Sequence, residues 1–212
     1  MVAANVVVAG KTPPPRGVRH ASRPYNLIST DRSPGDRPEI EAFIAQRFAE
    51  AYGARLDRFL PVLVALRDRA GNIVAAAGFG AADDGPLFLE RYLALPIESA
   101  FTAKAKRPVA RQSIVEIGNL AACTPGGTRL LAAAIARLLV DRGFEWAVFT
   151  ATTPVRNAIT RCGLLGYDFG PAERRAMGEA LPLWGSYYDN DPRLVGGSLT
   201  SAAVALAHAE AA

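Results

Sequence analysis

The chain of 212 residues contains few of the side chains that bind metals or form disulfides. Its two cysteines, Cys123 and Cys162, are too few for the disulfide framework of a secreted fold and lack the spacing of metal ligands. Its two histidines, His20 and His208, lie near the ends of the sequence. The body of the chain therefore lacks the residues of a zinc site or of a histidine-dependent catalytic triad, and we expect no metal.

The sequence also lacks long apolar runs. None approaches the roughly 18 to 20 residues that a helix needs to cross a bilayer, so we expect no membrane span. The first residues, MVAANVVVAGKTPPPRG, have no positive segment ahead of their short apolar run, which matches a signal peptide poorly. We therefore predict a cytoplasmic protein.

The excess of positive charge is small. There are 24 basic and 20 acidic residues, which give a net charge of +4, and only three of the basic residues are lysines. Arginine is well suited to phosphate and carboxylate because its guanidinium is a planar fork of donors. A charge of this size fits a small anionic ligand, but it does not indicate a nucleic-acid partner.

The composition is that of one folded domain with short extensions. Half of the residues are hydrophobic and 21% are charged, so apolar material for a core is ample. Residues 1–22 combine small residues, three consecutive prolines and scattered arginines, and we expect a disordered arm there. Residues 23–200 are predicted to form the domain, and the alanine-rich residues 201–212 a tail.

Hydrophobic periodicity and turn residues predict the order of the elements. We expect a short strand at 26–29, a helix from about 38 to Gly53, a hairpin of 59–67 and 73–79, a strand or helix at 87–93, a helix at 97–106, a strand at 113–122, a helix that stops at Gly143, a strand at 146–152, a helix from about Pro154 and an extended segment from Tyr167. The central strand–helix–strand unit implies a parallel pair with a right-handed crossover, whereas the hairpin implies antiparallel strands. We predict a mixed sheet of the α/β or α+β class.

A glycine-containing loop follows strand 113–122. Gly126 and Gly127 precede a helix whose first turn contains Thr128 and Arg129. Backbone amides of such a loop and the helix N-terminus favour a phosphate, so these four residues are candidate cofactor-binding residues. The alternative is a tight connection between strand and helix.

Glu116 is unusual because it lies in the otherwise apolar strand 113–122. An ionised carboxylate there is costly unless it is paired or faces a site, so Glu116 is the first candidate for a catalytic base. Strand alternation puts Asn119, a second catalytic candidate, on the opposite face, and the two converge only if a bulge intervenes. The alternative is a structural ion pair of Glu116 with Arg111 or Arg91.

Two other segments combine charged or polar side chains with aromatic ones. Glu90 and Arg91 either bind the amine or carboxylate of an acceptor or form a buried ion pair. Trp184 and Tyr188, in a late strand or loop, either line an acyl or acceptor pocket or complete the core. We treat Glu90 as a third catalytic candidate and the other three as candidate substrate-binding residues.

The helix after strand 146–152 opens with Asn157-Ala158-Ile159 and runs out through LLGY at 164–167, which resembles a helix of the GNAT acyltransferase superfamily. At a closer level the chain resembles the thermostable hemolysin family. Four segments in the expected order and spacing carry this resemblance: LFLERYLALPIE (87–98), IVEIGNLA (114–121), WAVFTATTPVRN (146–157) and LWGSYYDNDPRLVGG (183–197).

The resemblance implies a GNAT-like fold, with a mixed, mainly antiparallel sheet whose central parallel strands are splayed. It also implies that an acyl thioester, either acyl-CoA or an acyl carrier protein, binds beside this strand pair. The donor contacts that it implies are the strand positions Leu120, Ala121 and Ala122, then Thr150 in the next strand, and Arg156 and Asn157 at the start of the following helix.

The resemblance extends to the acyl-homoserine-lactone synthases, whose corresponding strand has a similar glutamate followed by a Ser-Arg pair. This chain has Gly118-Asn119 in that place, and it has Cys162 where many GNAT proteins have a tyrosine acid. These departures disfavour homoserine-lactone synthesis and tyrosine acid catalysis, but they leave acyl transfer to an amine. We expect Arg111, Arg129 and Arg156 in or beside the phosphate-binding elements.

The leading prediction is an N-acyltransferase that moves an acyl group from acyl-CoA or acyl carrier protein to a small amine. Catalysis would combine positioning, an oxyanion bound by a strand amide, and deprotonation assisted by Glu116. Two alternatives stay open: a membrane-active hemolysin or its accessory, and a non-catalytic acyl-CoA-binding protein. The absence of a long basic amphipathic helix argues against the first of these.

Overall fold

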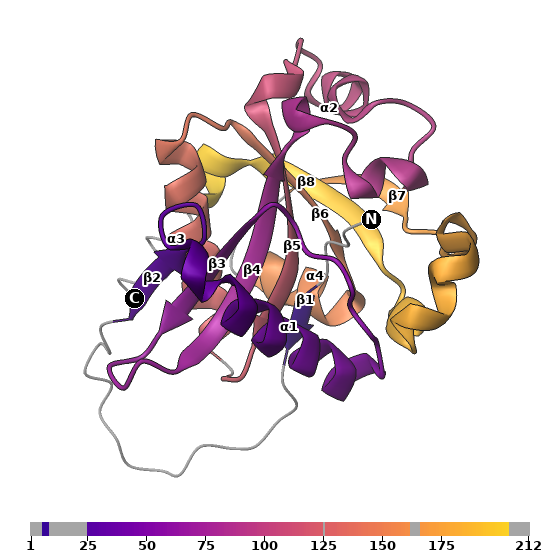
Figure 1. Cartoon of the computed structure of the whole chain (residues 1–212). Coiled ribbons are helices and arrows are strands. Elements are labelled where there is room, and N and C mark those ends of the chain that lie inside the picture. Colours follow the sequence, from indigo (N-terminus) through magenta and orange to yellow (C-terminus); the bar gives the residue numbers. More distant parts are fainter. Residues whose placement is uncertain (1–5, 9–24, 125, 162–165, 204–212) are drawn as a thin grey trace.

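The computed structural model describes residues 6–8, 25–124, 126–161 and 166–203 (Figure 1). Its helices are α1 (Arg37–Tyr52), α2 (Ile97–Ala105), α3 (Gly127–Asp141) and α4 (Thr153–Arg161). Its strands are β1 (Val6–Val8), β2 (Asn26–Ser29), β3 (Val62–Arg67), β4 (Ile73–Ala81), β5 (Ile114–Ala122), β6 (Trp146–Ala151), β7 (Tyr167–Pro171) and β8 (Arg193–Ser198). Short 3₁₀ segments connect them: η1 (Pro34–Asp36), η2 (Ala82–Asp84), η3 (Phe88–Tyr92), η4 (Arg111–Ser113), η5 (Arg174–Trp184) and η6 (Tyr187–Asn190).

The strands form one mixed sheet in the order β2-β3-β4-β5-β6-β8-β7, and β1 adds to β5 outside this path. Along the path β5 and β6 are parallel, joined by the crossover helix α3, and the other neighbouring pairs are antiparallel. This confirms the predicted mixed, mainly antiparallel sheet with a central parallel pair.

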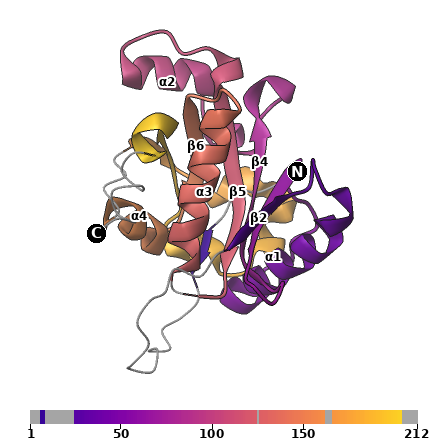
Figure 2. The ribbon, with the colours of Figure 1, turned by 90° about the vertical axis from the view of Figure 1, so that its left-hand side faces the viewer.

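Helices cover both faces of the sheet (Figures 1 and 2). On one face, α1 packs through Ile40, Ile44 and Phe48, which recur every four residues and have no exposed surface. α2 covers the same face further along. On the other face, α3 contributes Leu131 and Ile135, and α4 packs beside it. Because both faces are covered, β4 and β5 are apolar along nearly their whole length.

The predicted elements are present with boundaries shifted by a few residues. α1 ends at Gly53 as predicted, because a φ of +65° there suits glycine and its N–H donates to the carbonyl of Ala49. The segment 87–93, which the sequence left open between strand and helix, contains η3. The late aromatic segment consists of 3₁₀ turns, with positive φ at Gly178 and Gly185.

Three residues of the predicted disordered arm are ordered. Val6–Val8 form β1, which pairs in parallel with Leu120–Ala122 of β5. Consecutive valines favour extended structure, and this edge of β5 has no other strand partner among the described residues. The rest of the arm, Cys162 and the tail beyond residue 203 lie outside the described residues.

The parallel strands β5 and β6 diverge after a short contact. Residues 114–116 of β5 pair with 146–148 of β6, and their pairing ends there. We call the divergence between 117–122 and 149–151 the splay. Since α3 follows β5 and α4 follows β6, both helix N-termini lie at the far end of the splay. The predicted splayed pair is confirmed.

Candidate active site

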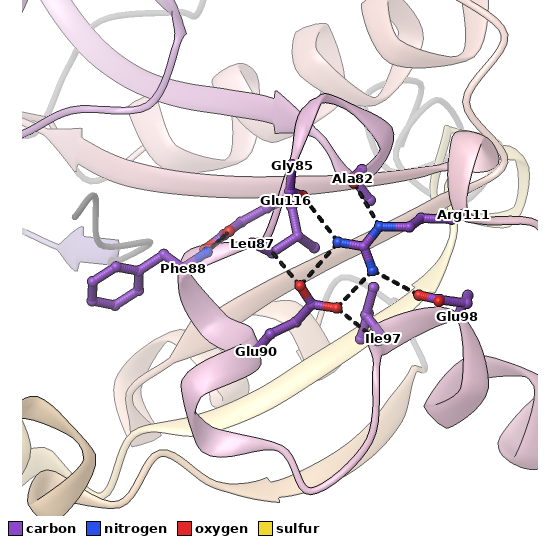
Figure 3. Close-up of polar contacts among 9 residues, drawn as sticks. All are labelled: Ala82, Gly85, Leu87, Phe88, Glu90, Ile97, Glu98, Arg111 and Glu116. Atoms are coloured by element: carbon purple, nitrogen blue, oxygen red, sulfur yellow. Dashed lines mark hydrogen bonds and ion pairs between the residues drawn. The ribbon is translucent and has the colours of Figure 1, made fainter.

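Glu116 is the last residue of β5 that pairs with β6 before the splay. Its side chain is fully buried, at 0% exposed. Oε2 accepts a hydrogen bond of 2.8 Å from the N–H of Phe88, whereas Oε1 has no partner among the described residues (Figure 3). Burial raises the pKa of Glu116 to about 8, and the amides of Phe88 and Leu89 oppose only part of that rise. Glu116 can therefore exchange a proton close to neutral pH.

A bulge in β5 brings Asn119 to the face on which Glu116 lies. Two residues of β5, Asn119 and Leu120, lie opposite a single residue of β4, and Asn119 has a φ of +53°. Oδ1 of Asn119 accepts a hydrogen bond of 2.9 Å from the N–H of Leu60. The same oxygen lies 3.1 Å from the Cβ position of Gly78, on the side that Glu116 faces. The bulge that convergence of the two residues requires is present, and Asn119 uses its side-chain carbonyl to hold the main chain at Leu60.

Glu90 belongs to an ion-pair network beside the site. Its carboxylate accepts hydrogen bonds of 2.9 Å from the N–H groups of Leu87 and Ile97, and bonds of 2.7 and 2.9 Å from Arg111 (Figure 3). Burial alone would raise its pKa, but Arg111 and the two amides together lower the pKa of Glu90 to about 2. This geometry corresponds to the ion-pair alternative, with Arg111 as the partner of Glu90.

Arg111 connects four segments of the chain. Besides Glu90, it pairs with Glu98 at 2.7 Å and donates to the carbonyls of Ala82 at 2.7 Å and Gly85 at 2.9 Å (Figure 3). Arg111 precedes β5, whose nine residues span about 30 Å and separate it from the glycine loop. The expectation that Arg111 lies beside the phosphate-binding elements is therefore wrong, and its guanidinium is already held by two carboxylates.

Aromatic side chains from η3 and η6 form a cluster around the turn whose amide binds Glu116. The guanidinium carbon of Arg91 lies 3.9 Å from the ring centroid of Phe88, a cation–π contact. The hydroxyls of Tyr92 and Tyr188 are 2.6 Å apart. Burial, with a smaller contribution from the charge of Glu116, raises the pKa of Tyr92 to about 12, so Tyr92 is a neutral hydrogen-bonding group.

Trp184 and Met177 complete this cluster of side chains, which we call the aromatic wall. The rings of Trp184 and Phe88 have centroids 6.2 Å apart, and Trp184 is 6% exposed. Sδ of Met177 lies 3.2 Å from the hydroxyl of Tyr92 and 3.5 Å from Nη1 of Arg91. The structure thus brings the three predicted substrate-binding residues, Arg91, Trp184 and Tyr188, into one cluster.

β6 contributes buried hydroxyls on the other side of the splay. Thr150 and Thr152 lie two and four residues beyond the partner of Glu116, on the same face, and are 2% and 1% exposed. The hydroxyl of Thr150 has no hydrogen-bond partner among the described residues. The same holds for the hydroxyl of Tyr187, which is buried against Tyr52 with ring centroids 5.3 Å apart. Buried polar groups normally have partners, so these hydroxyls indicate a place for a polar ligand.

The predicted phosphate contacts lie at the N-terminus of α3. Gly126 caps the helix, and a Cβ on Gly127 would lie 3.2 Å from the carbonyl oxygen of Val74. Gly127 is therefore packed closely against β4, which is compatible with the structural alternative of a tight connection. Thr128 is half-buried, with a hydroxyl that has no partner among the described residues, and Arg129 is exposed. The two side chains remain candidates for contact with a phosphate.

The remaining predicted donor contacts differ in their surroundings. Arg156 donates to the carbonyl of Ala151 at 2.9 Å and pairs with the carboxylate of Asp191 at 2.6 Å. Asn157, the next residue of α4, is exposed. The edge of Leu120–Ala122 that faces the splay is paired with β1. Of this set, Arg156 thus fixes the start of α4 in the structure, and Asn157 faces solvent.

Sequence reasoning missed several residues of the site. The amide of Phe88, which donates to Glu116, has no signature in a sequence because every residue except proline has such a group. Tyr187 belongs to the Gly-Ser-Tyr-Tyr segment that indicated Tyr188, so its signal was present. Tyr52 gave no signal, because the last residue of an amphipathic helix does not reveal what it meets.

The sequence profile of the thermostable hemolysin family matches residues 30–203. The chain belongs to the thermostable hemolysin family. The match spans the four segments that carried the resemblance and every candidate site residue, whereas β1 of this hemolysin-family protein lies outside it. No curated protein matches the chain.

Solved structures show which fold the hemolysin-family chain has. FeeM, an N-acyl amino acid synthase from uncultured soil microbes, has a TM-score of 0.57 at 10% identity, over 84% of this chain and 93% of FeeM. The acyl-homoserine-lactone synthase LasI has a TM-score of 0.57 at 15% identity, over 85% and 91%. The CoA-dependent acyl-homoserine lactone synthase MesI has a TM-score of 0.55 at 14% identity, over 89% and 96%. The predicted GNAT-like fold is confirmed.

The described residues contain no group of three or more His, Cys, Asp or Glu side chains that could hold a metal. Across the same part of the chain, each helix is too short or too polar to cross a membrane. Cys123, on the glycine loop, is an exposed free cysteine.

Proposed function

We propose that this protein is an N-acyltransferase that moves an acyl group from a thioester donor, acyl-CoA or acyl carrier protein, to a small-molecule amine. The observation that carries this proposal is Glu116, a fully buried carboxyl with one unpartnered oxygen among the described residues, placed where the parallel strands diverge. The fold supports it, because structures with the same fold include synthases of N-acyl amino acids and acyl-homoserine lactones.

The proposed reaction needs a base of moderate strength. An amine attacks a thioester as the free base, so a proton must leave the nitrogen. Oε1 of Glu116 takes that proton as the nitrogen–carbon bond forms and the carbon–sulfur bond breaks, and the departing thiolate then gains a proton from Glu116 or from water. A pKa of about 8 lies close to those of a peptide α-amino group and a cysteine thiol, roughly 8 to 8.5, so proton transfer to and from groups of this kind is nearly balanced.

We place the donor in the splay. Amides of Leu120–Ala122 would bind the thioester oxyanion, with Thr150 across the splay. The phosphates would lie toward the N-terminus of α3, near Thr128 and Arg129, where the helix dipole and the arginine favour negative charge. Asn157 would contact the pantetheine from α4. This arrangement needs the splay edge of β5 that β1 occupies in the structure.

We place the acceptor against the aromatic wall beside Glu116. Phe88, Trp184 and Tyr188 would enclose its apolar part, and Arg91 would bind a carboxylate. Amino acids are therefore the first acceptor class to test. The location of the protein in the cytoplasm stays a prediction.

Mass spectrometry of lipids and N-acyl metabolites tests the proposal most broadly. Cells that express the wild-type chain should gain an N-acyl amine that is missing in cells with Glu116→Gln. Glu145→Gln is the matched control, because Glu145 is 60% exposed and lies in a surface pair with Arg107. Purified protein with a panel of acyl-CoA donors and amino acids should reproduce the product.

Two results would overturn the proposal. Tight binding of acyl-CoA without turnover over the whole amine panel would indicate a non-catalytic acyl-CoA-binding protein. Release of dye from liposomes by the protein alone, without an acyl donor, would indicate a membrane-active hemolysin.

A further inference from the structure

We propose that Arg111 and Glu90 are positioning residues that hold η3 so that its first amides meet the carboxyl of Glu116. The catalytic consequence of this inference rests on the proposed function, but the positioning itself does not. Neither residue touches the proposed reacting atoms. Both sit at the centre of the polar network that surrounds the entry to η3 (Figure 3).

Glu90 fixes the turn that holds Glu116. Its Oε2 accepts from the N–H of Leu87, and the next N–H along the chain, that of Phe88, donates to Oε2 of Glu116. The first amides of a helical turn have no partner within the turn and point the same general way. The bond between Glu90 and Leu87 therefore sets the direction of the Phe88 amide.

Arg111 connects the two segments that form the hydrogen bond between the Phe88 amide and Glu116. Through Glu90 and the carbonyl of Gly85 it holds the segment that becomes η3. Arg111 also begins η4, the turn that leads directly into β5, on which Glu116 lies. Its further bond to Glu98 holds α2 against the same turn. A change at Arg111 thus alters the position of the Phe88 N–H relative to the carboxyl of Glu116.

The side chains around Glu116 determine how its pKa responds to substitutions nearby. The charged and titratable side chains that act on it, Glu90, Arg91 and Tyr92, all come from η3. β4 and β6 present Gly80 and Val148 beside it. The pKa of Glu116 is therefore sensitive to the charge and position of one short turn.

The two substitutions shift the titration of Glu116 in opposite directions. Arg111→Gln leaves the charge of Glu90 without its counter-ion and loosens the Phe88 amide, and both effects favour the protonated carboxyl. We expect the midpoint to rise by about one pH unit. Glu90→Gln removes the like charge and keeps an acceptor for Leu87, so the midpoint should fall by a similar amount. Arg111→Lys, which keeps the charge, should restore most of the wild-type midpoint.

NMR titration of ¹³C-labelled glutamate in the full-length protein measures these midpoints without turnover, and the pH profile of kcat measures them during turnover. Glu145→Gln is the control, because Glu145 belongs to an exposed pair with Arg107, and the midpoint of Glu116 in this variant should equal that of the wild type. Folding is checked by circular dichroism. Shifts in the same direction, or no shift in a folded Arg111→Gln protein, would overturn the positioning role. Loss of the proposed function would appear differently, as a wild-type protein that titrates as expected but transfers no acyl group.

A second inference comes from β1 and also rests on the proposed function. Val6–Val8 pair with Leu120–Ala122 on the splay edge of β5, and β1 contacts both α1 and α4. These are the strand positions to which we assign the thioester. An N–H that bonds to β1 cannot point at the donor as well, so we infer that β1 covers the donor edge and is displaced when the donor binds.

Proline substitution in the full chain tests this inference. Val7→Pro together with Val8→Pro removes a donor on each edge of β1 and should prevent its pairing. We expect coenzyme A to bind about tenfold more tightly, because the competent state no longer has to be released from β1. Val2→Pro is the control in the same arm. Faster amide exchange at 120–122 with an unchanged affinity for coenzyme A would show that β1 does not compete with the donor. Unchanged amide exchange would show that β1 does not pair with β5. Absence of binding in wild type and variant alike, with faster exchange, would count against the donor site itself.

Discussion

Glu116 and Glu90 are two glutamates in or near η3 whose pKa values are shifted in opposite directions. Glu90 accepts hydrogen bonds from Leu87, Ile97 and both terminal nitrogens of Arg111, and its pKa is lowered to about 2. Glu116 accepts a short bond from the amide of Phe88 and leaves Oε1 without a partner among the described residues, and its pKa is raised to about 8.

The comparison shows that burial and hydrogen-bond donors act in opposite directions on the pKa of a carboxylate, and that burial dominates at Glu116. A guanidinium and two amides outweigh the desolvation of Glu90 and fix it as an anion that holds the chain. Among the described residues, Glu116 has only uncharged backbone amides as hydrogen-bond donors, and it can therefore gain and lose a proton. The ion-pair network of Glu90 thus supports Glu116, whose carboxyl accepts from the amide next to the one that Glu90 binds.

The largest effect should follow removal of the proton acceptor. Glu116→Gln keeps an oxygen for the Phe88 amide but cannot take a proton, so kcat should fall by about 10²- to 10⁴-fold. The variant should fold as well as the wild type, because it removes a buried ionisable group. Steady-state kinetics and thermal denaturation measure the two quantities, and wild-type turnover would refute the assignment.

The next effect concerns the stability of the network. Glu90→Ala leaves Arg111 with one carboxylate and removes the acceptor of two amides, and the free energy of unfolding should fall by about 1–3 kcal/mol, less than for a fully buried pair because the site is partly exposed. Urea denaturation measures it. A loss as small as that of a surface pair would show that Glu90 does not hold η3.

The two carboxylates should also give opposite pH dependences of stability. The folded-state pKa of Glu90 lies below its ordinary value, so its contribution is present above about pH 4.5 and is lost as pH falls toward 2. The folded-state pKa of Glu116 lies above its ordinary value, so its contribution is full below about pH 4.5 and is lost as pH rises through 8. Tm measured from pH 3 to 9 should decline between about pH 4.5 and 8 in the wild type and less so in Glu116→Gln. An equal decline in both proteins would contradict the raised pKa.

The smallest effect is expected at the surface. Arg107 and Glu145 form a pair 3.5 Å long in which both side chains are more than half exposed. Glu145→Gln should change the free energy of unfolding by no more than about 0.5 kcal/mol, because water and salt screen such pairs. A larger change would show that urea denaturation reports on charge alone and would weaken the interpretation of Glu90→Ala.

Part of the site could be predicted from single residues. A glutamate inside an apolar strand identified Glu116, whereas the bulge that brings Asn119 to the same face could be named only as a condition for the two to meet. Sequence could not assign the partner of Glu90, because Arg91 is adjacent in the chain while Arg111 is brought close by folding. It also could not show that the group facing Glu116 is a backbone amide.

The fold was easier to predict from the sequence than the long-range contacts that complete it. Strand–helix–strand periodicity gave the parallel pair, since apolar spacing depends on local geometry. The pairing of Val6–Val8 with β5 was not predictable, because it depends on an edge that becomes available only where β5 and β6 separate. Such long-range pairings leave no pattern in the paired segment itself.

The pH dependence of kcat for acyl transfer, compared between the wild type and Glu116→Gln, tests the central claim most directly. The account predicts that the wild-type rate rises with pH through a midpoint near 8, as Glu116 loses its proton, and that the variant is slow and lacks this midpoint. A wild-type rate that is flat across this range, or a midpoint that persists in Glu116→Gln, would contradict it.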